Sequence, residues 1–412
     1  MTSQTDVAVA GGGPAGLTLA LLMLRSGYRV TVLEKARSLE RDYRGEILQP
    51  GGMTLLGELG VLKPARSHGA YPLRRFQLLE QDRTLMDIDY QQLPPPYSFL
   101  LSIPQRHILQ ELLEACGRYP GFTYVPGRPV SALIEKDAKI TGVVHGTGSE
   151  AEQLLARCVV GADGRYSKVR RLAGIGYTRK ETFAHDVLWF KIPAGENTRY
   201  CVQVHRGRGN PVLLYNSYPG NIQVGWTLPH RSYREVAAKG IGYVKDQILR
   251  AVPAHAQAID DAVQSLTDLT LLDVFAGMAD TWTRDGLVLI GDSAHTHGPI
   301  GAQGINLAIQ DATELHPALV QALRTGDTDA GQFTGFTKAR RPDIDAVMNL
   351  QARQSQALLS HGKASDTMRP IMMRLLGKTP LYSRILHRIA FGRRPINIRS
   401  ELFSTAPTSF PG

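Results

Sequence analysis

Hydrophobic positions follow two different periods along the chain, and the changes of period divide it into regions. An apolar run at residues 7–10 leads into a glycine-rich turn. Apolar residues then recur at helical spacing over residues 15–25, before a second run at residues 29–33. This order predicts a strand, a helix and a second strand of a parallel sheet. The chain therefore begins with an α/β unit.

Two later regions alternate with a period of two, which predicts antiparallel strands. Residues 76–80 and 85–88 form one predicted hairpin, and four further runs lie within residues 187–228. One face of the last run carries four large apolar residues: Ile222, Val224, Trp226 and Leu228. A helical stretch over residues 233–262 follows. We interpret the strands and this stretch as a second domain inserted into the first.

Length and composition agree with this division. The chain has 412 residues, 43% of them hydrophobic, which suits two or three domains with a substantial core. The three cysteines, Cys116, Cys158 and Cys201, have no spacing typical of a metal site or a disulfide framework. We expect free thiols in a reducing compartment. The chain shows no basic leader and no apolar run of about 20 residues, so the expected location is cytoplasmic.

The formal net charge of +10 is concentrated towards the C-terminus. Basic and apolar residues recur together within residues 363–399, which predicts amphipathic helices. No nucleic-acid-binding module accompanies this charge. The simpler reading is a helix pair that packs on the protein with a solvated basic face. The alternative is peripheral contact with an anionic membrane through these helices.

The glycines of the first turn have the spacing G-x-G-x-x-G, at Gly11, Gly13 and Gly16. In dinucleotide-binding turns the first glycine permits the tight turn, the second permits close approach of a pyrophosphate, and the third permits close packing of helix and strand. Glu34 ends the second strand, about 20 residues further on, where an acid can bind a ribose hydroxyl. The pattern therefore predicts a dinucleotide site. The alternative is a structural turn without a ligand.

Two further motifs follow predicted buried strands. Residues 161–170 read G-A-D-G-R-Y-S-K-V-R, a turn with an acid before a short helix capped by Ser167. Residues 291–306 carry G-D-S-A-H and then P-I-G-A-Q-G-I-N, which opens a long helix. Asp292 can accept a hydrogen bond from a ribityl hydroxyl, and the helix N-terminus favours a ligand that becomes anionic, such as a reduced flavin. His295 and His297 have H-x-H spacing, but no third ligand is evident, so we expect no metal site.

The ordered set of three motifs resembles the single-component FAD-dependent monooxygenases, the family of para-hydroxybenzoate hydroxylase. The resemblance covers most of residues 1–345. It implies an α/β fold: a Rossmann-like FAD-binding domain, an inserted, mainly antiparallel β-sheet substrate domain, and a C-terminal helical region. The expected division is FAD-binding domain 1–72, 101–181 and 268–345, substrate domain 73–100 and 182–267, and C-terminal helical region 346–412.

The resemblance also implies which residues bind FAD. The diphosphate would be held at the first turn, and the family's two FAD-contacting arginines match Arg44 and Arg106. Ala302 stands where many members have glycine. The implied cofactor-binding residues are Gly11, Gly13, Pro14, Ala15, Gly16, Glu34, Lys35, Arg44, Arg106, Val130, Asp163, Asp292, Pro299, Gly304, Ile305 and Asn306.

The activity implied by the resemblance is hydroxylation of an aromatic substrate, phenolic or heteroaromatic and including natural products. NADPH or NADH would reduce FAD transiently, and O2 would then form a flavin hydroperoxide that the ring attacks. The W-x-W-x-I-P signature of flavin halogenases is missing. Two alternatives stay open: an FAD-dependent reductase or dehydrogenase without oxygen insertion, and a non-catalytic flavin-binding protein.

Residues for the aromatic substrate are sought on the inserted sheet. Tyr215 and Trp226 are the candidates for contact with the ring. A residue that removes a phenol proton is not identified, although Tyr215, Tyr218 and His185 lie in this region. The expected partners are a small aromatic substrate and O2, with no nucleic acid.

Overall fold

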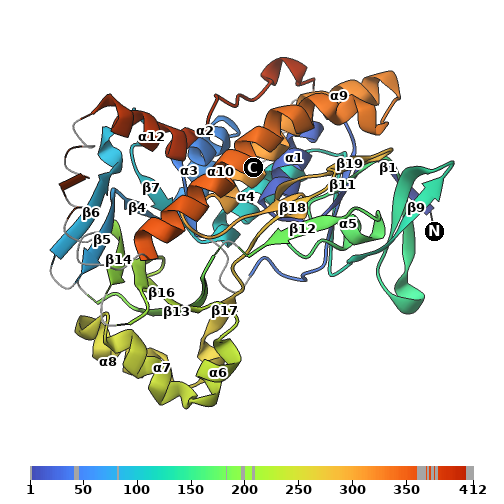
Figure 1. Cartoon of the computed structure of the whole chain (residues 1–412). Helices are drawn as coiled ribbons and strands as arrows, with labels where there is room; N and C mark the ends of the chain where they lie inside the picture. The colour runs from blue at the N-terminus through green and yellow to red at the C-terminus, as the bar shows by residue number, and fades with distance from the viewer. Residues whose placement is uncertain are drawn as a thin grey trace.

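Two large sheets organise the computed structural model (Figure 1). The structure describes residues 2–40, 46–80, 83–181, 183–195, 200–206, 209–359, 368, 371–372, 375 and 379–404. The first sheet has eight strands and the second has seven, and two three-stranded sheets lie beside them.

The eight-stranded sheet has a parallel centre, in the order β20-β11-β1-β2-β8, with β19 antiparallel at one edge. The strand β11 is long: its first half pairs with the β9–β10 hairpin and its second half with β20. The strands are β1 (Thr2–Ala10), β2 (Val30–Glu34), β8 (Phe122–Pro126), β9 (Val130–Lys136), β10 (Lys139–His145), β11 (Glu152–Gly161), β19 (Thr283–Arg284) and β20 (Leu287–Leu289).

Helices cover this sheet, and the most buried of them follows the first glycine turn. Residues 15–24 of α1 are all buried, because α1 packs against both α4 and α9. The strand β1 and α1 therefore supply much of the main hydrophobic core. The helices of this region are α1 (Pro14–Arg25), α2 (Pro50–Glu58), α3 (Leu62–Ser67), α4 (Gln105–Gly117), α5 (Lys168–Leu172), α9 (Gly304–Thr325) and α10 (Thr334–Leu359).

The seven-stranded sheet has the order β17-β13-β16-β15-β14-β5-β6. Its neighbours are antiparallel except β14 and β5, whose parallel pairing joins the early hairpin to the later strands. The strands are β5 (Arg75–Glu80), β6 (Arg83–Asp89), β13 (His185–Pro193), β14 (Cys201–Arg206), β15 (Val212–Ser217), β16 (Asn221–Pro229) and β17 (Thr270–Leu272).

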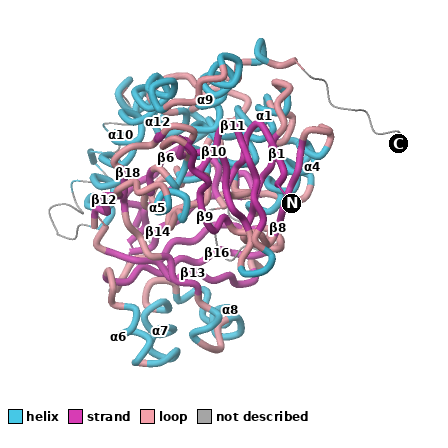
Figure 2. The backbone as a smooth tube through the Cα atoms, turned by 90° about the vertical axis from the view of Figure 1, so that its right-hand side faces the viewer, coloured by secondary structure: helices cyan, strands magenta, loops and turns pink. Residues whose placement is uncertain are grey.

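The two faces of this sheet belong to different cores. The outer face packs under the helices α6 (Tyr233–Ala238), α7 (Gly240–Leu249) and α8 (Ala256–Ala262), which Figures 1 and 2 show at the foot of the molecule. The helical stretch expected over residues 233–262 is thus three short helices. After the break, α7 begins at Gly240, whose φ of +81° lies in the left-handed region that suits glycine. The inner face joins a separate cluster with residues from the small sheets and the C-terminal region.

The small sheets and α12 complete this inner cluster. One small sheet has the order β3-β7-β4 and the other β12-β18-β21. Their strands are β3 (Ile47–Leu48), β4 (Tyr71–Leu73), β7 (Leu100–Ser102), β12 (Tyr177–Lys180), β18 (Ala276–Ala279) and β21 (His295–Thr296). The helix α12 (Pro380–Phe391) packs on α2 and buries Tyr382, Leu386 and Ala390 in the cluster.

The mixed α/β fold with a helical C-terminal part is confirmed. Two elements cross the expected divisions. The helix α10 runs through residue 346, and β17, from the segment expected in the FAD-binding domain, is the edge strand of the seven-stranded sheet. We keep the three-part division as a proposal. No helix among the described residues is long and apolar enough to span a bilayer.

Candidate active site

The first turn requires glycine at two positions. Gly11 has φ +110°, and a Cβ there would lie 2.3 Å from the carbonyl oxygen of Ala162. A Cβ on Gly16 would lie 2.0 Å from the carbonyl oxygen of Gly11. The cap position of α1 is Gly13, followed by Pro14, and no side chain caps this N-terminus. Backbone N–H groups and the positive end of the helix dipole are therefore offered at the turn, as a diphosphate requires.

Glu34 is fixed beside this turn. It ends β2, is 4% exposed, and accepts hydrogen bonds from the backbone N–H of Gly12 (2.8 Å) and of Ala36 (2.9 Å). The carboxylate thus holds the turn in shape and stands where the ribose of a bound dinucleotide is expected. The neighbouring Lys35 is exposed.

The other predicted residues of this region are dispersed. Arg106 lies in the first turn of α4, where its Nη1 is 3.3 Å from Glu40 Oε1 and its side chain is 46% exposed. Val130 is buried at the start of β9. Arg44 lies outside the described residues.

The three motifs meet in space. Asp163 accepts hydrogen bonds from the hydroxyls of Ser167 and Ser293, the latter at 3.1 Å, so the second motif is tied to the third. Gly291 of the third motif lies against Ala15 of the first, where a Cβ would be 3.4 Å from the Ala15 Cβ. The close approach of the Gly11 turn to residue 162 joins the first motif to the second. One site therefore receives all three.

Asp292 is the partly exposed acid of this site. Its side chain is 29% exposed, and its Oδ2 lies 3.7 Å from the Nε of Arg165. Arg165 also donates a hydrogen bond to the carbonyl oxygen of Asp273 (3.1 Å). The carboxylate is thus accessible beside the glycine turn, with one guanidinium as its neighbour.

The side-chain amide of Asn306, in the first turn of α9, holds the loop before this helix. Asn306 is buried; it accepts from the backbone N–H of Gln49 (3.0 Å) and donates to the carbonyl oxygen of Ala302 (2.8 Å). Ile305 is buried as well, whereas Pro299 and Gly304 are partly exposed. Ala302 has φ +50°, in the left-handed region that favours glycine. This backbone conformation explains why glycine suits the position.

A buried ionic cluster lies behind this loop; we call Arg340, Asp311, His295 and His297 the helix cluster. Arg340 Nε donates to Asp311 Oδ1 (2.8 Å), and the other carboxylate oxygen lies 2.6 Å from His295 Nε2. His295 Nδ1 lies 2.8 Å from His297 Nε2. Burial alone would raise the pKa of Asp311, but the charges of His295 and Arg340 hold that pKa well below its usual value. Burial, and then the neighbouring His295, lowers the pKa of His297 well below its usual value.

The helix cluster gives the two histidines of the H-x-H pair a structural role. Each histidine uses a ring nitrogen for its neighbour, and Asp311 also accepts from the backbone N–H of Gly291 (2.8 Å). Its carboxylate therefore ties the turn after β20 to α9, and through Arg340 to α10.

The two predicted substrate residues lie on opposite faces of the seven-stranded sheet. Tyr215 is in the inner cluster, where its ring meets that of Trp189 edge to face at 6.3 Å between centroids. Trp226 is in the outer core under α6, α7 and α8, 1% exposed. We therefore correct the interpretation of Trp226 to a core residue. Of the other candidates, His185 begins β13, and Tyr218 packs edge to face on His107 at 5.8 Å.

A second ionic cluster stands on the inner face; we call Glu46, Lys191 and Ser217 the sheet cluster. Lys191 Nζ donates to Glu46 Oε1 (2.7 Å), and Ser217 Oγ donates to Glu46 Oε2 (2.6 Å). Sequence analysis missed this cluster. The available signal was Lys191 itself, which shares a face with the buried Val187 and Trp189 in the strand β13.

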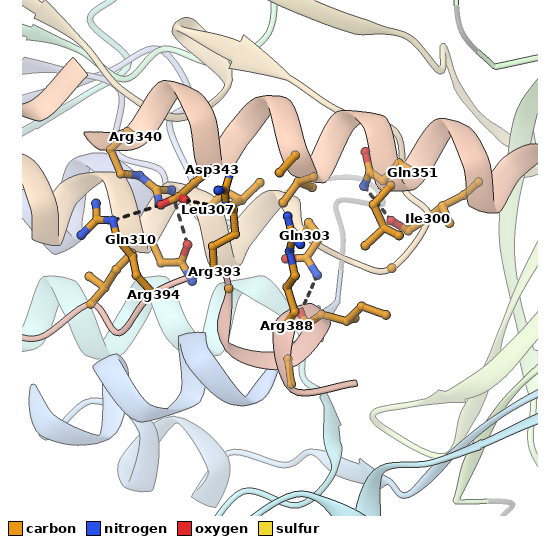
Figure 3. Close-up of a pocket in the computed structure, with 18 of the residues that line it drawn as sticks. Ile300, Gln303, Leu307, Gln310, Arg340, Asp343, Gln351, Arg388, Arg393 and Arg394 are labelled. Atoms are coloured by element: carbon orange, nitrogen blue, oxygen red, sulfur yellow. Dashed lines mark hydrogen bonds and ion pairs between the residues drawn. The ribbon is translucent and has the colours of Figure 1, made fainter. Parts of the chain in front are cut away.

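A small pocket between α9, α10 and α12 shows how the C-terminal helices brace the loop before α9 (Figure 3). Gln351 of α10 donates to the carbonyl oxygens of Gly298 (3.0 Å) and Ile300 (2.6 Å), and Gln303 donates to that of Ile389 in α12 (2.9 Å). The pocket volume of about 30 Å³ holds little more than one water. It is therefore a packing feature rather than a substrate site.

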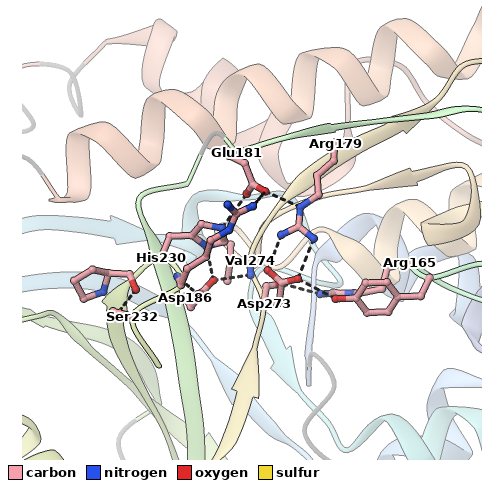
Figure 4. Close-up of polar contacts among 11 residues, drawn as sticks. Arg165, Arg179, Glu181, Asp186, His230, Ser232, Asp273 and Val274 are labelled. Carbon is pink, nitrogen blue, oxygen red and sulfur yellow. Dashed lines mark hydrogen bonds and ion pairs between the residues drawn. The ribbon is translucent and has the colours of Figure 1, made fainter. Parts of the chain in front are cut away.

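Polar contacts also fasten the connection between the two large sheets (Figure 4). Asp273 accepts two hydrogen bonds from Arg179 (2.8 and 3.1 Å) and one from the hydroxyl of Tyr166 (2.9 Å). Partial burial alone would raise the pKa of Asp273, but the hydrogen bonds from Arg179 and Tyr166 hold it below its usual value. The second motif is thus linked to the segment that leaves β17.

The same contacts include a group whose ligand atoms could surround a metal ion: Asp186, His230 and Asp273. Asp186 already accepts from His230 Nδ1 (2.8 Å) and from the backbone N–H groups of Arg231 and Val274. Since guanidinium and N–H groups occupy both carboxylates, the arrangement is that of a structural polar network.

The donors present fit FAD. The glycine cradle leaves no room for a Cβ, α1 offers an uncapped N-terminus, and an acid stands at the end of β2. A partly exposed carboxylate and a second uncapped helix start, at α9, lie in the third motif, which is tied to the other two. A diphosphate, a ribose and a ribityl chain each find a group of suitable chemistry here.

Comparison with known proteins decides the family. The family described as "FAD binding domain" matches residues 4–350. The chain belongs to the FAD-dependent monooxygenases of the aromatic hydroxylase type. A 6-methylpretetramide 4-monooxygenase from Streptomyces rimosus is 52% identical to it, over 97% of this chain and 96% of the relative.

Solved structures show the same fold. The p-nitrophenol 4-monooxygenase PnpA from Pseudomonas putida DLL-E4 superposes with a TM-score of 0.79 at 20% identity, over 95% of this chain and 99% of that one. PqsL from P. aeruginosa, in complex with 2-aminobenzoylacetate, gives 0.76 at 23% identity, over 90% and 100%. The protein is thus an FAD-dependent monooxygenase that hydroxylates an aromatic substrate.

Proposed function

We propose that this monooxygenase hydroxylates a fused-ring aromatic phenol of the 6-methylpretetramide type. The observation that carries this proposal is the 52% identity to a 6-methylpretetramide 4-monooxygenase across nearly the whole of both chains. Such extensive identity favours a shared substrate class over a reductase without oxygen insertion or a non-catalytic flavin-binding protein.

We further propose the binding roles for the cofactor. Gly11, Gly13, Pro14, Ala15 and Gly16 hold the diphosphate, and Glu34 and Lys35 lie at the adenosine ribose. Asp292 binds the ribityl chain, and the loop from Pro299 to Asn306 lies against the flavin ring. The remaining proposed contacts are Arg44, Arg106, Val130 and Asp163. The support is the convergence of the three motifs and the fit of their donors.

Bound FAD supplies the redox and oxygen chemistry, with NADPH or NADH as the proposed reductant. The chain orients the aromatic ring and keeps water away from it. Tyr215, on the inner face of the seven-stranded sheet, is a proposed contact of the ring, because it belongs to the hydrophobic cluster against which Ile300 and Ala302 of the loop before α9 pack.

The test is anaerobic reduction of the protein-bound flavin by NADPH, with and without 6-methylpretetramide, followed by admission of O2. The expected result is faster reduction with the compound present and a product heavier by one oxygen atom. NADH is tested in parallel. Fast reduction without the compound and no oxygenated product would contradict the proposal.

Two finer statements belong to the same proposal. We place the protein in the cytoplasm, because the wide spacing of its three cysteines is not that of a disulfide framework. Peripheral membrane contact through the basic C-terminal helices stays a prediction, and most of residues 360–378 lie outside the described part of the chain. Flotation with anionic vesicles at low salt is its test, and a protein that stays at the bottom of the gradient removes it.

A further inference from the structure

We propose that the sheet cluster binds and ionises a phenol of the substrate, with Glu46 as the proton acceptor and Lys191 as the cation that holds the phenolate. This inference rests on the proposed function, since it requires a phenolic ring at the inner face of the seven-stranded sheet. It assigns the proton acceptor that the sequence left unidentified.

The sheet cluster joins the segment before β3 to the inner face of the seven-stranded sheet. Glu46 immediately precedes β3, and its backbone carbonyl accepts from the N–H of Ile103 (2.7 Å). Lys191 and Ser217 come from β13 and β15 of the seven-stranded sheet. The next residues after Glu46 lead to Gln49, whose side chain donates to the carbonyl oxygen of Gly301 (2.7 Å) in the proposed flavin loop. The sheet cluster is therefore anchored to that loop.

An aromatic wall stands beside the sheet cluster. Lys191, Gln223 and Tyr215 form one row across three neighbouring strands and share the inner face. In the adjacent row, Trp189 lies over Gly225, where a Cβ would be 2.5 Å from the indole. A flat apolar row thus lies next to a row with polar groups, which matches a fused aromatic ring with oxygen substituents.

The row has hydrogen-bonding capacity that the described residues do not use. The ammonium of Lys191 has three donors, and Glu46 is its one acceptor among the described residues. The side-chain oxygen of Gln223 is buried without a partner there, although the residue is only 2% exposed. Buried polar groups are nearly always paired. A ligand oxygen that accepts from Lys191, and a ligand hydroxyl that donates to Gln223, would satisfy both.

Stability does not account for the sheet cluster. Removing a lysine and a carboxylate from water costs free energy that their attraction recovers only with good geometry and further hydrogen bonds. Here the lysine keeps open donors and its side chain remains 25% exposed, against 11% for that of Glu46. A pair held in this state, among apolar neighbours, is typical of a binding site.

The proposed step moves one proton from the phenol to Glu46. The phenol hydroxyl donates its proton to a carboxylate oxygen of Glu46, which becomes a neutral acid, and no electrons leave the ring. The phenolate oxygen then replaces that carboxylate as the acceptor for Lys191. The ring is richer in electrons and more reactive towards an oxygen electrophile. Ser217 holds the second oxygen of Glu46, so the acceptor keeps its orientation.

Tyr215 does not compete for this role. Burial, and then the charge of Glu46, raises the pKa of Tyr215 well above its usual value. Its hydroxyl therefore stays protonated and can only donate to the substrate or accept from it as a neutral group.

The test measures the absorption spectrum of 6-methylpretetramide bound to the oxidised holoenzyme, after subtraction of the flavin bands, together with steady-state kcat and KM. The variants are Lys191→Met, Lys191→Arg and Glu46→Gln. The matched control is Lys139→Met, which removes a partly exposed lysine that pairs with Asp329 at 2.8 Å on the other large sheet. Flavin content is measured for each protein, so that a folding defect is recognised.

We expect the native protein, Lys191→Arg and the control to bind the compound as the phenolate. Lys191→Met and Glu46→Gln should bind it un-ionised, with kcat lower by about 100-fold or more. If either of the two shows the native spectrum and kcat, the inference is overturned. If the native protein binds the compound un-ionised and still hydroxylates it, the inference fails while the proposed function stands. A native protein that neither binds nor hydroxylates the compound overturns both.

Discussion

The helix cluster and the sheet cluster differ in how completely their hydrogen-bonding groups are used. In the helix cluster, the side chains of Arg340, Asp311 and His295 are 0% exposed, and the carboxylate accepts from three donors on three elements. In the sheet cluster, Lys191 keeps two donors without an acceptor among the described residues, and its side chain is a quarter exposed.

This difference indicates that the helix cluster stabilises the fold and that the sheet cluster binds a ligand. A saturated buried cluster leaves nothing for a ligand and fixes the elements that it joins, here the turn after β20, α9 and α10. An unsaturated one keeps hydrogen-bonding groups that a ligand can use. The sheet cluster is of this kind, and it lies where the inner face of the seven-stranded sheet meets the residue before β3. Substitutions in the helix cluster should therefore cost stability, whereas those in the sheet cluster should cost substrate binding and turnover.

The largest expected effect is on stability, from Arg340→Met in the helix cluster. The substitution leaves Asp311 buried without its cation, and breaking a buried pair in this way costs about 3–5 kcal/mol. Urea unfolding of the holoprotein measures the loss. The control Lys139→Met removes an exposed pair and should cost about 1 kcal/mol or less. A similar, small loss for both variants would contradict the scaffold role.

Acid should weaken the same scaffold through His316, which lies on α9 with its Nε2 2.8 Å from the hydroxyl of Ser26. Burial lowers the pKa of His316 from 6.5 to about 4, so the unfolded chain binds its proton first as the pH falls. Stability is complete above pH 6.5 and is lost as the pH falls towards 4, by about 3 kcal/mol over this window.

Unfolding free energies between pH 7 and pH 4 check this prediction. His316→Gln should flatten the pH dependence, because the group that takes up the proton is gone. His387→Gln, at an exposed position on α12, should leave the dependence as it is in the native protein. Equal slopes in the native protein and His316→Gln would contradict the prediction.

The smallest effect is expected from Ser217→Ala in the sheet cluster. The variant removes one hydrogen bond to Glu46, worth roughly 1 kcal/mol, so kcat should fall by about fivefold. Stability should change by less than about 1 kcal/mol, because the pair of Glu46 and Lys191 is retained. Kinetics and urea unfolding of the same preparation show both values. A stability loss as large as that of Arg340→Met would erase the distinction between the clusters.

Local sequence patterns were sufficient to predict the main strands and a helix cap. The apolar runs predicted β1, β2 and most strands of the seven-stranded sheet. A strand that is buried on one or both faces has a recognisable pattern of apolar residues over a few consecutive positions. Ser167 caps α5 as expected, since its hydroxyl accepts from the N–H of Arg170 (2.9 Å). Such features depend on neighbours a few residues apart.

Features that depend on register or on distant pairing could not be read in this way. In the pairing of β15 with β16, Val212 lies opposite Trp226 and Tyr215 lies opposite Gln223, so Tyr215 and Trp226 point to opposite faces of the sheet. No local sequence pattern specifies this register. Glu46 and Lys191 are 145 residues apart in the chain, so their contact exists only once both sheets are assembled. The roles of the cofactor-binding residues likewise stay predictions, although the structure brings the three motifs together.

The most direct test of the difference between the two clusters is the dissociation constant of 6-methylpretetramide. It is measured in the native protein, Lys191→Met and His297→Gln from the change in flavin absorbance on binding. Loss of a charge-assisted hydrogen bond should weaken binding to Lys191→Met by about tenfold or more, whereas His297→Gln should stay within about twofold of the native value. Native affinity in Lys191→Met, or equal weakening in both variants, would show that the sheet cluster is not the substrate site.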